Sequence, residues 1–562
     1  MSSIAMNDPW MLSRRRFLGC AAAGIGGGML AAGLPTTLAA EKPHSIGAEP
    51  QLFLDDFLIA EQRGFTRKLH QPEKQGLIRN ADGSDWDVGS VYQGNIVCRD
   101  ASGRFHMTYR YSWWDASVRD LHPSIGEDKA HWFRESVGYA TSDDGIHWEK
   151  PRLGLVDGPA GFRKSAEFPF QEPTGMSRDN NLGCPFDFAY DLHAHGNGTD
   201  PARRFLLRAI KLDDTHPFAK AIETEMYYAK DWPDIAGNPR WKEGLEPIPK
   251  ATISPRGFKS MAGFDRDAGE WFAVSQDTLP NWLARGGRDI ARYASKDLIE
   301  WHGPELALPV PPDESRDPKA YVEYMDMLAY RIGGANSGAW LGQLVIFHGD
   351  RTNPQYMMPR REGIWRKGTT EVRLVISRDA GRSWQHLGNR AIWLPCHSDP
   401  HGYDRLVFAT YPVRVGDEAW FYYCAWNGDH LVFNRDGSLF EPGFLRTHRV
   451  ARATMRWNGY ISLDAGKSPA QLTTKPLQFQ GKELFVNLHA PTGNFVAELQ
   501  DESGKPLPGF RFADGVPMSG DGLELPVHWA NRDLSSIQGK TVRVKFEVAN
   551  GSLYGFQFGT RG

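Results

Sequence analysis

The chain has 562 residues, of which 41% are hydrophobic and 24% are charged, so it carries enough apolar material for a large core. Its 65 basic and 68 acidic side chains give a net charge of −3. No basic stripe or Lys/Arg run follows the first residues, so the composition gives no support for a nucleic-acid partner.

The first 40 residues are typical of an export signal rather than of a folded domain. The segment Ser13-Arg14-Arg15-Arg16-Phe17-Leu18 precedes a weakly apolar run rich in Ala and Gly, which ends in small residues. This order resembles a twin-arginine signal cleaved near Ala39 or Ala40, and it predicts a periplasmic or secreted protein. Because the apolar run is short and rich in glycine, we expect no stable membrane anchor after cleavage.

A turn pattern occurs twice at identical spacing. Thr141–Trp148 and Ser377–Trp384 both contain a hydroxyl residue followed by Asp, Gly and Trp at the third, fifth and eighth positions. Each copy follows an alternating run, 137–140 or 372–376, that is typical of a β-strand. We expect the Asp to cap backbone N–H groups, the Gly to adopt a positive φ, and the Trp to pack onto the strands.

Eroded versions of this turn near residues 231, 297 and 457 indicate a repeating unit of strands and turns. The third strands of the units begin near residues 137, 225, 289, 372 and 448. Five units predict an all-β fold with a five-bladed β-propeller over residues 50–477, including an early strand at Gln51–Ile59. Alternating segments further on predict a small C-terminal β-sandwich over residues 478–562.

Four cysteines follow the signal segment, and none forms a CxxC pair: Cys98, Cys184, Cys396 and Cys424. Their wide spacing argues against zinc and redox chemistry. One or two disulfides and four buried free thiols are both compatible with it. No HExxH motif, calcium loop or phosphate-binding glycine motif occurs either, so we predict no metal and no cofactor.

Carboxylates recur where the innermost strand of four of the five units begins. In a propeller these strands line the axial funnel, so residues at their starts face a ligand. Hydrolysis of a glycosidic bond needs one carboxylic acid and a second carboxylate as base or nucleophile. For any one of these residues, a turn cap or a solvated rim charge is the alternative. The candidate catalytic residues are Asp87, Asp187, Glu323, Asp326 and Asp404.

Basic and aromatic residues near the same strand starts are candidates for substrate binding. Arg256 and Lys259 take the place of a carboxylate in the third unit, and Arg405 follows the last acid of the set. We expect these three cations to orient hydroxyls or acidic groups of a substrate. Trp86 and His430 complete the predicted binding set.

The strand-and-turn phrases LFLDDFLIA, SDDGIHWEKP and SKDLIEWHGP carry a family resemblance. Five blades followed by a sandwich resemble the fructan- and arabinan-cleaving furanosidase clans of glycoside hydrolases, and the repeated turn resembles the Asp-box of sialidase-type propellers. The resemblance implies an exported enzyme that cleaves an oligo- or polysaccharide in the propeller funnel. Asp187 or Asp87 would then be the base or nucleophile, and Glu323 the general acid.

Two alternatives keep the same architecture and a carbohydrate partner. The first is a carbohydrate-binding propeller without turnover. The second is a glycoside phosphorylase, in which Arg256 and Lys259 would hold phosphate.

Overall fold

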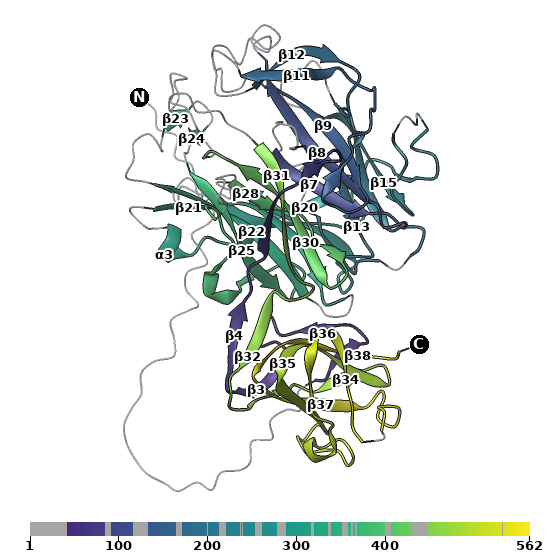
Figure 1. Cartoon of the computed structure of the whole chain (residues 1–562), viewed down its shortest axis with the longest axis vertical. Helices are drawn as coiled ribbons and strands as arrows, with labels where there is room; N and C mark the ends of the chain where they lie inside the picture. Colours follow the sequence, from purple (N-terminus) through teal and green to yellow (C-terminus); the bar gives the residue numbers. More distant parts are fainter. Residues whose placement is uncertain are drawn as a thin grey trace, which may run out of the picture. The chain divides into compact units, whose positions relative to one another are not determined.

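The computed structural model (Figure 1) is almost entirely β-structure. Within its described residues the one α-helix is the four-residue α3 (Pro312–Ser315), and no helix is long and apolar enough to span a membrane. The described residues are 42–84, 92–115, 133–164, 171–198, 200–212, 221–236, 238, 240–252, 261–277, 288–315, 320–334, 339–350, 358–360, 363–365, 368–398, 406–429, 448–530 and 532–561.

The five predicted units form the five blades of a β-propeller. The first blade is the antiparallel sheet of β7 (Tyr92–Arg99), β8 (Phe105–Trp114) and β9 (Phe133–Ser142). The second blade consists of β13 (Phe186–Asp191), β14 (Phe205–Leu212), β15 (Ala221–Ala229) and β16 (Glu246–Ile248). The third blade consists of β17 (Met261–Asp265), β18 (Glu270–Asp277), β19 (Asp289–Ser295) and β20 (Trp301–Leu308). The short pair β6 (Arg79–Asn80) and β10 (His147–Trp148) and the hairpin β11 (Gly158–Lys164), β12 (Gln171–Ser177) accompany the first blade.

The fourth blade is a five-stranded sheet. It consists of β21 (Ala320–Ile332), β22 (Ala339–Asp350), β25 (Thr369–Ser377), β26 (Gln385–His386) and β27 (Ile392–Leu394), with the hairpin β23 (Met358–Arg360), β24 (Gly363–Trp365) inserted after its second strand.

The fifth blade joins both ends of the propeller chain. Its strands are β28 (Leu406–Ala409), β29 (Val413–Val415), β30 (Glu418–Trp426), β31 (His448–Arg456) and, from the N-terminal part, β5 (Glu73–Leu77). β5 pairs antiparallel with β31, with Leu77 opposite Ala451. The ring is therefore closed by hydrogen bonds between segments about 370 residues apart, and β5 becomes the outermost strand of the fifth blade.

Residues 44–69 belong to the C-terminal sheet and not to the propeller. The sheet has eleven strands: β1 (His44–Gly47), β2 (Gln51–Leu52), β3 (Ile59–Arg63), β4 (Phe65–Leu69), β32 (Ile461–Ala465), β33 (Ala470–Thr474), β34 (Leu477–Phe479), β35 (Glu483–Gln500), β36 (Met518–Val527), β37 (Thr541–Ala549) and β38 (Gly551–Gly559).

These pairings correct two details of the predicted division at residues 50 and 477. The segment Gln51–Ile59 is not one strand: it contains β2 and the first residue of β3, and both strands pair with C-terminal strands. β32 and β33 also belong to this sheet, although they precede residue 478. Residues 1–40, assigned to the export signal, lie outside the described residues.

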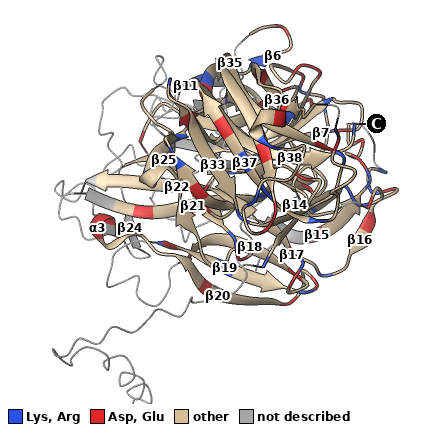
Figure 2. Ribbon diagram, turned by 90° about the horizontal axis from the view of Figure 1, so that it is seen from below, with Lys and Arg blue, Asp and Glu red and all other residues tan. Residues whose placement is uncertain are grey.

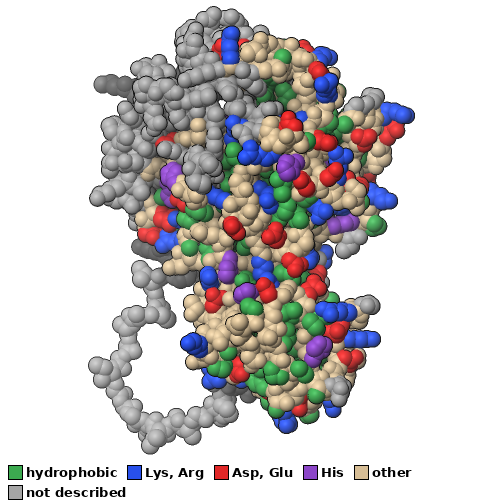
Figure 3. Space-filling model, in the orientation of Figure 1, with side chains coloured by type: hydrophobic (Ala, Val, Ile, Leu, Met, Phe, Trp, Pro, Cys, Tyr) green, Lys and Arg blue, Asp and Glu red, His purple; other side chains and the backbone are tan. Residues whose placement is uncertain are grey.

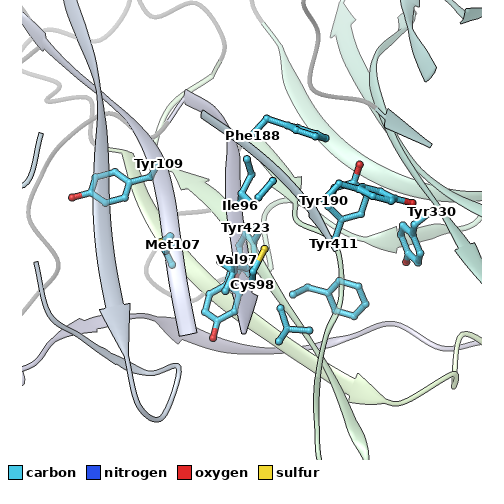
Figure 4. Packing of buried hydrophobic residues seen from close by; sticks show 14 of the residues in the cluster. Ile96, Val97, Cys98, Met107, Tyr109, Phe188, Tyr190, Tyr330, Tyr411 and Tyr423 are labelled. Carbon is cyan, nitrogen blue, oxygen red and sulfur yellow. The ribbon is translucent and has the colours of Figure 1, made fainter. Parts of the chain in front are cut away.

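Tyrosines connect the inner strands of several blades (Figure 4). Tyr411 donates a hydrogen bond to the carbonyl of Met261 at 2.7 Å, and Tyr190 donates to the carbonyl of Ala262 at 2.9 Å. The hydroxyl of Tyr330 lies 3.0 Å from that of Tyr460. All of these side chains are buried. Each of these four hydroxyls therefore has a partner, and the bonds join the second and fifth blades to the third and connect β21 to the residue before β32.

The repeated turns have the predicted capping, with one change of residue. In the first turn Asp144, not Asp143, accepts the backbone N–H groups of Ile146 and His147, both at 2.8 Å. Asp143 has an 89% exposed side chain 3.5 Å from Arg104. The cap lies one residue later because the turn is shorter than the pattern implied.

In the turns of the third and fourth blades an Asp side chain also caps backbone N–H groups. Asp297 accepts the N–H groups of Ile299 and Glu300, and Asp379 accepts that of Ser383. A residue with positive φ directly follows each Asp: Gly145 at 73°, Leu298 at 65° and Ala380 at 54°, the last of which precedes Gly381 at 78°. The tryptophans Trp148 and Trp384 are buried, as predicted.

The four described cysteines are free thiols, so the disulfide alternative is wrong for them. Burial raises the pKa of Cys184 to about 12, which keeps it protonated and unreactive. Acidic and basic positions alternate over the ribbons in Figure 2, and charges of both signs are interspersed on the face drawn in Figure 3.

Candidate functional site

Three predicted carboxylates lie on inner strands near their starts: Asp187 on β13, and Glu323 and Asp326 on β21. The inner strands of a propeller run in the same direction, so their starts meet at one end of the ring. The other predicted residues lie outside the described part of the chain: Trp86, Asp87, Arg256, Lys259, Asp404, Arg405 and His430.

Asp187 lies in a β-bulge of the second blade. Phe186 pairs with Ala209 and Phe188 with Arg208, so Asp187 is the extra residue between two paired positions. The inner strands β7, β17 and β21 also have register shifts, at Tyr92/Ile96, Met261/Gly263 and Tyr324/Asp326. A bulge bends the strand and redirects side chains, which suits the ends of strands around a funnel.

Asp187 forms a buried bidentate ion pair with Arg208. Its carboxylate accepts hydrogen bonds from Nε at 2.7 Å and Nη2 at 2.6 Å, and both side chains are 7% exposed. The planar guanidinium matches the two carboxylate oxygens, so the orientation of Asp187 is fixed.

Glu323 is fixed in the same way by Arg288, which comes from the third blade. Its oxygens accept from Nη2 at 3.0 Å, from Nε at 3.1 Å and from the backbone N–H of Arg288 at 3.3 Å. Glu323 is 1% exposed. Arg288 also donates from Nη1 to Gln276. In these contacts the carboxylate acts only as an acceptor, which suits a base, a nucleophile or an orienting group better than a proton donor.

Asp326 is half-buried and lies nearer the tyrosine cluster. Its Oδ1 accepts the N–H of Met327 at 2.8 Å. Burial, followed by the nearby Tyr190 and Asp326, raises the pKa of Tyr411 well above its usual value. Asp326 therefore acts electrostatically on a residue of the fifth blade, across the inner part of the propeller.

Two further carboxylates were not predicted. Asp277 at the end of β18 and Asp289 at the start of β19 pair directly across the third blade, and they are 3% and 4% exposed. Asp277 accepts from the hydroxyl of Tyr293, and Asp289 accepts from the N–H of Val310 at 2.9 Å. Paired buried acids with neighbouring Arg288 and Glu323 form a concentrated set of titratable groups. The sequence signal was present, because Asp289 stands at the predicted start of the third strand of this unit.

No cluster of three or more His, Cys, Asp or Glu side chains suited to a metal ion occurs among the described residues. The arrangement instead consists of carboxylates fixed by arginine, tyrosine and backbone N–H groups. Chemically, it provides preorganised acceptors for hydroxyl groups and for a developing positive charge.

No protein-family model matches the chain, and no curated protein matches it. The structure is similar to a solved glycoside hydrolase (14% identity, 69% of this chain and 92% of that chain, TM-score 0.35). It is also similar to a β-1,2-mannobiose phosphorylase from Listeria innocua (12% identity, 66% of this chain and 90% of that chain, TM-score 0.33). A third similar structure is a GH32 β-fructofuranosidase from Bombyx mori (11% identity, 88% of this chain and 95% of that chain, TM-score 0.27). At these values the likenesses carry no argument about chemistry.

Proposed function

We propose that the chain is a glycoside-processing enzyme that cleaves glycosidic bonds of an oligo- or polysaccharide at the funnel end defined by Asp187 and Glu323. One observation carries the proposal: two carboxylates from different blades are almost fully buried at inner-strand starts, each fixed by an arginine. Two preorganised carboxylates are what glycosidic cleavage requires. Asp187 acts as base or nucleophile in this scheme.

A carboxylic acid other than Asp187 supplies the proton in this scheme. Glu323 was predicted as the general acid, yet its contacts with Arg288 favour an acceptor. The other candidates for the general acid are Asp326, Asp277 and Asp289, which the structure describes, and Asp87 and Asp404, which lie outside the described residues. Substitution of each acid by its amide, with pH profiles of kcat, assigns the donor because loss of the acid removes the alkaline limb of the profile.

A panel of oligo- and polysaccharides tests the function. The mature chain is incubated with each glycan, and new reducing ends are measured with and without inorganic phosphate. Reducing ends in buffer alone support hydrolysis. A strict requirement for phosphate, with release of a sugar phosphate, supports the phosphorylase alternative instead.

A carbohydrate-binding propeller without turnover is the second candidate. The bidentate pairs of Asp187 and Glu323 favour it, because carboxylates engaged by arginine make stable acceptors for sugar hydroxyls. Glycan binding without product release over long incubation selects this candidate.

We also propose export through the twin-arginine pathway, which transports folded proteins. The four free cysteines support it, since folding in a reducing compartment leaves thiols unpaired. Replacement of both Arg14 and Arg15 by Lys is expected to retain the protein in the cytoplasm, as measured by cell fractionation. Unchanged export of that variant contradicts the proposal.

A further inference from the structure

A cavity lies at the opposite end of the inner strands from Asp187. Its volume is about 510 Å³, within the range of small-molecule sites. The ends of β7 and β13, the segment before β29, and Trp457 line it. Asp187 is the second residue of β13 and Asp191 the last, so this cavity and the proposed catalytic end occupy different parts of the blade.

His195 forms the buried part of this cavity. It is 5% exposed, and its ring centroid lies 4.9 Å from those of Tyr190 and Tyr411 and 5.7 Å from that of Tyr330, the tyrosines drawn in Figure 4. No hydrogen bond reaches its ring nitrogens from the residues that the structure describes. Burial lowers the pKa of His195 to about 4, so at neutral pH the imidazole offers one donor and one acceptor.

The acids of the cavity are occupied within the protein. Asp191 accepts from Arg204 at 3.0 and 3.1 Å and from the N–H groups of His193 and Ala194. Asp100 accepts hydrogen bonds from the hydroxyl of Ser102, from the backbone N–H of Arg104 and from the ring of His106. Arg204 offsets the charge of Asp191, and the oxygens of Asp100 are engaged by groups of the protein itself.

Two arginines retain donors. Arg99 donates from Nε to the carbonyl of Gly103 and from Nη1 to that of Arg414. Arg414 donates from Nε to the carbonyl of Gly416, and its guanidinium lies 5.5 Å from the ring of Trp457. Among the described residues, Nη2 of Arg99 and both terminal nitrogens of Arg414 donate no hydrogen bond. The rim is therefore cationic with an aromatic side, and the buried end is neutral and polar.

We infer that this cavity binds a small polyhydroxylated carboxylate, such as a sugar acid, independently of the proposed catalytic end. The carboxylate pairs with Arg99 and Arg414, a hydroxyl exchanges hydrogen bonds with His195, and the ring packs on Trp457. A neutral sugar lacks the first interaction, and a simple anion lacks the other two.

Calorimetry with the full mature chain tests the site. The probes are glucuronate, glucose, acetate and inorganic phosphate at matched ionic strength. Glucuronate is expected to bind at least tenfold more tightly than each of the other three. If glucose binds as tightly as glucuronate, the carboxylate does not contribute to binding. If acetate or phosphate binds as tightly as glucuronate, the hydroxyls do not contribute. Either result, or no glucuronate binding at tens of millimolar, overturns the inference.

Variants locate the binding. His195→Phe keeps the aromatic packing and Arg414→Gln changes an exposed side chain, so both are expected to fold, with melting temperatures checked. Each should weaken glucuronate binding at least fivefold, whereas Arg390→Gln, on another blade, should not. Asp187→Asn should retain binding, which separates this site from the proposed function. Unchanged affinity in both His195→Phe and Arg414→Gln overturns the inference.

Discussion

Arg288 of the third blade donates hydrogen bonds to both carboxylate oxygens of Glu323 in the fourth blade, at 3.0 and 3.1 Å. The backbone carbonyl of Arg288 also accepts the N–H of Tyr324 at 3.1 Å. One residue therefore links two neighbouring blades by side chain and backbone. The link fixes Glu323 and couples the geometry of the proposed catalytic end to the packing of the blades.

Loss of the carboxylate charge should destabilise the two ion pairs unequally. We expect Asp187→Asn to lower the free energy of unfolding by about 3–5 kcal/mol, because the substitution removes one charge of a bidentate pair whose two side chains are both 7% exposed. Glu323→Gln should cost about 1–3 kcal/mol, because Arg288 is 30% exposed and also bonds to Gln276. Urea unfolding measures both. A larger loss for Glu323→Gln would contradict this account.

The first repeated turn offers a matched pair of neighbouring acids. Asp144→Ala should cost about 1–2 kcal/mol because two backbone N–H groups lose their acceptor, whereas Asp143→Ala should cost almost nothing. Burial opposes ionisation of Asp144, but hydrogen bonds from His147, Ile146 and Ser142 outweigh it and lower its pKa. Its contribution is therefore present above about pH 4 and is lost below it. Equal unfolding midpoints of the two variants would refute the assignment.

Stability should fall as the pH decreases from 6.5 to 4. Burial lowers the pKa of His195 to about 4, so the unfolded chain binds a proton in this window that the folded chain does not bind. The full effect is about 3 kcal/mol, and it is complete below pH 4. Urea midpoints between pH 4 and 8 should show a shallower slope for His195→Phe than for the wild type. Equal slopes for His195→Phe and the wild type would contradict this prediction.

The N-terminal strands should be required for the fold. Removal of residues 1–41 is expected to leave the unfolding transition unchanged, whereas removal of 1–77 deletes β5 and the four strands that pair with the C-terminal sheet. The longer truncation should expose β31 to rapid hydrogen exchange, because its outer N–H and C=O groups lose their partners. Unaltered protection of β31 would show that β5 does not close the ring.

Local signals predicted the blades well. Strands such as Phe205–Leu212 and Glu418–Trp426 coincide with runs rich in apolar and aromatic residues. The long-range pairings were beyond such signals. Gln51 lies opposite Phe556, and nothing in either segment identifies a partner about 500 residues away.

The candidate site was predictable only in part. Asp187 and Glu323 follow from their place at strand starts, but their arginine partners depend on packing between strands and blades. The choice of Asp143 over Asp144 failed because adjacent acids fit the same pattern and only the turn geometry separates them. Asp277 and Asp289 were not predicted, because the candidates were taken from the starts of inner strands and these two acids lie on the second and third strands of their blade.

In the proposed function Asp187 and Glu323 are both required for cleavage of the glycosidic bond. The decisive measurement is reducing-end release from the responsive glycan by the wild type, Asp187→Asn, Glu323→Gln and the control Asp265→Asn, all assayed below their unfolding midpoints. Asp265 is also buried and paired with Arg382, at the other end of its inner strand. We predict a loss of about 10²-fold or more for the first two variants and less than about threefold for the control. Wild-type rates in both Asp187→Asn and Glu323→Gln would contradict the assignment.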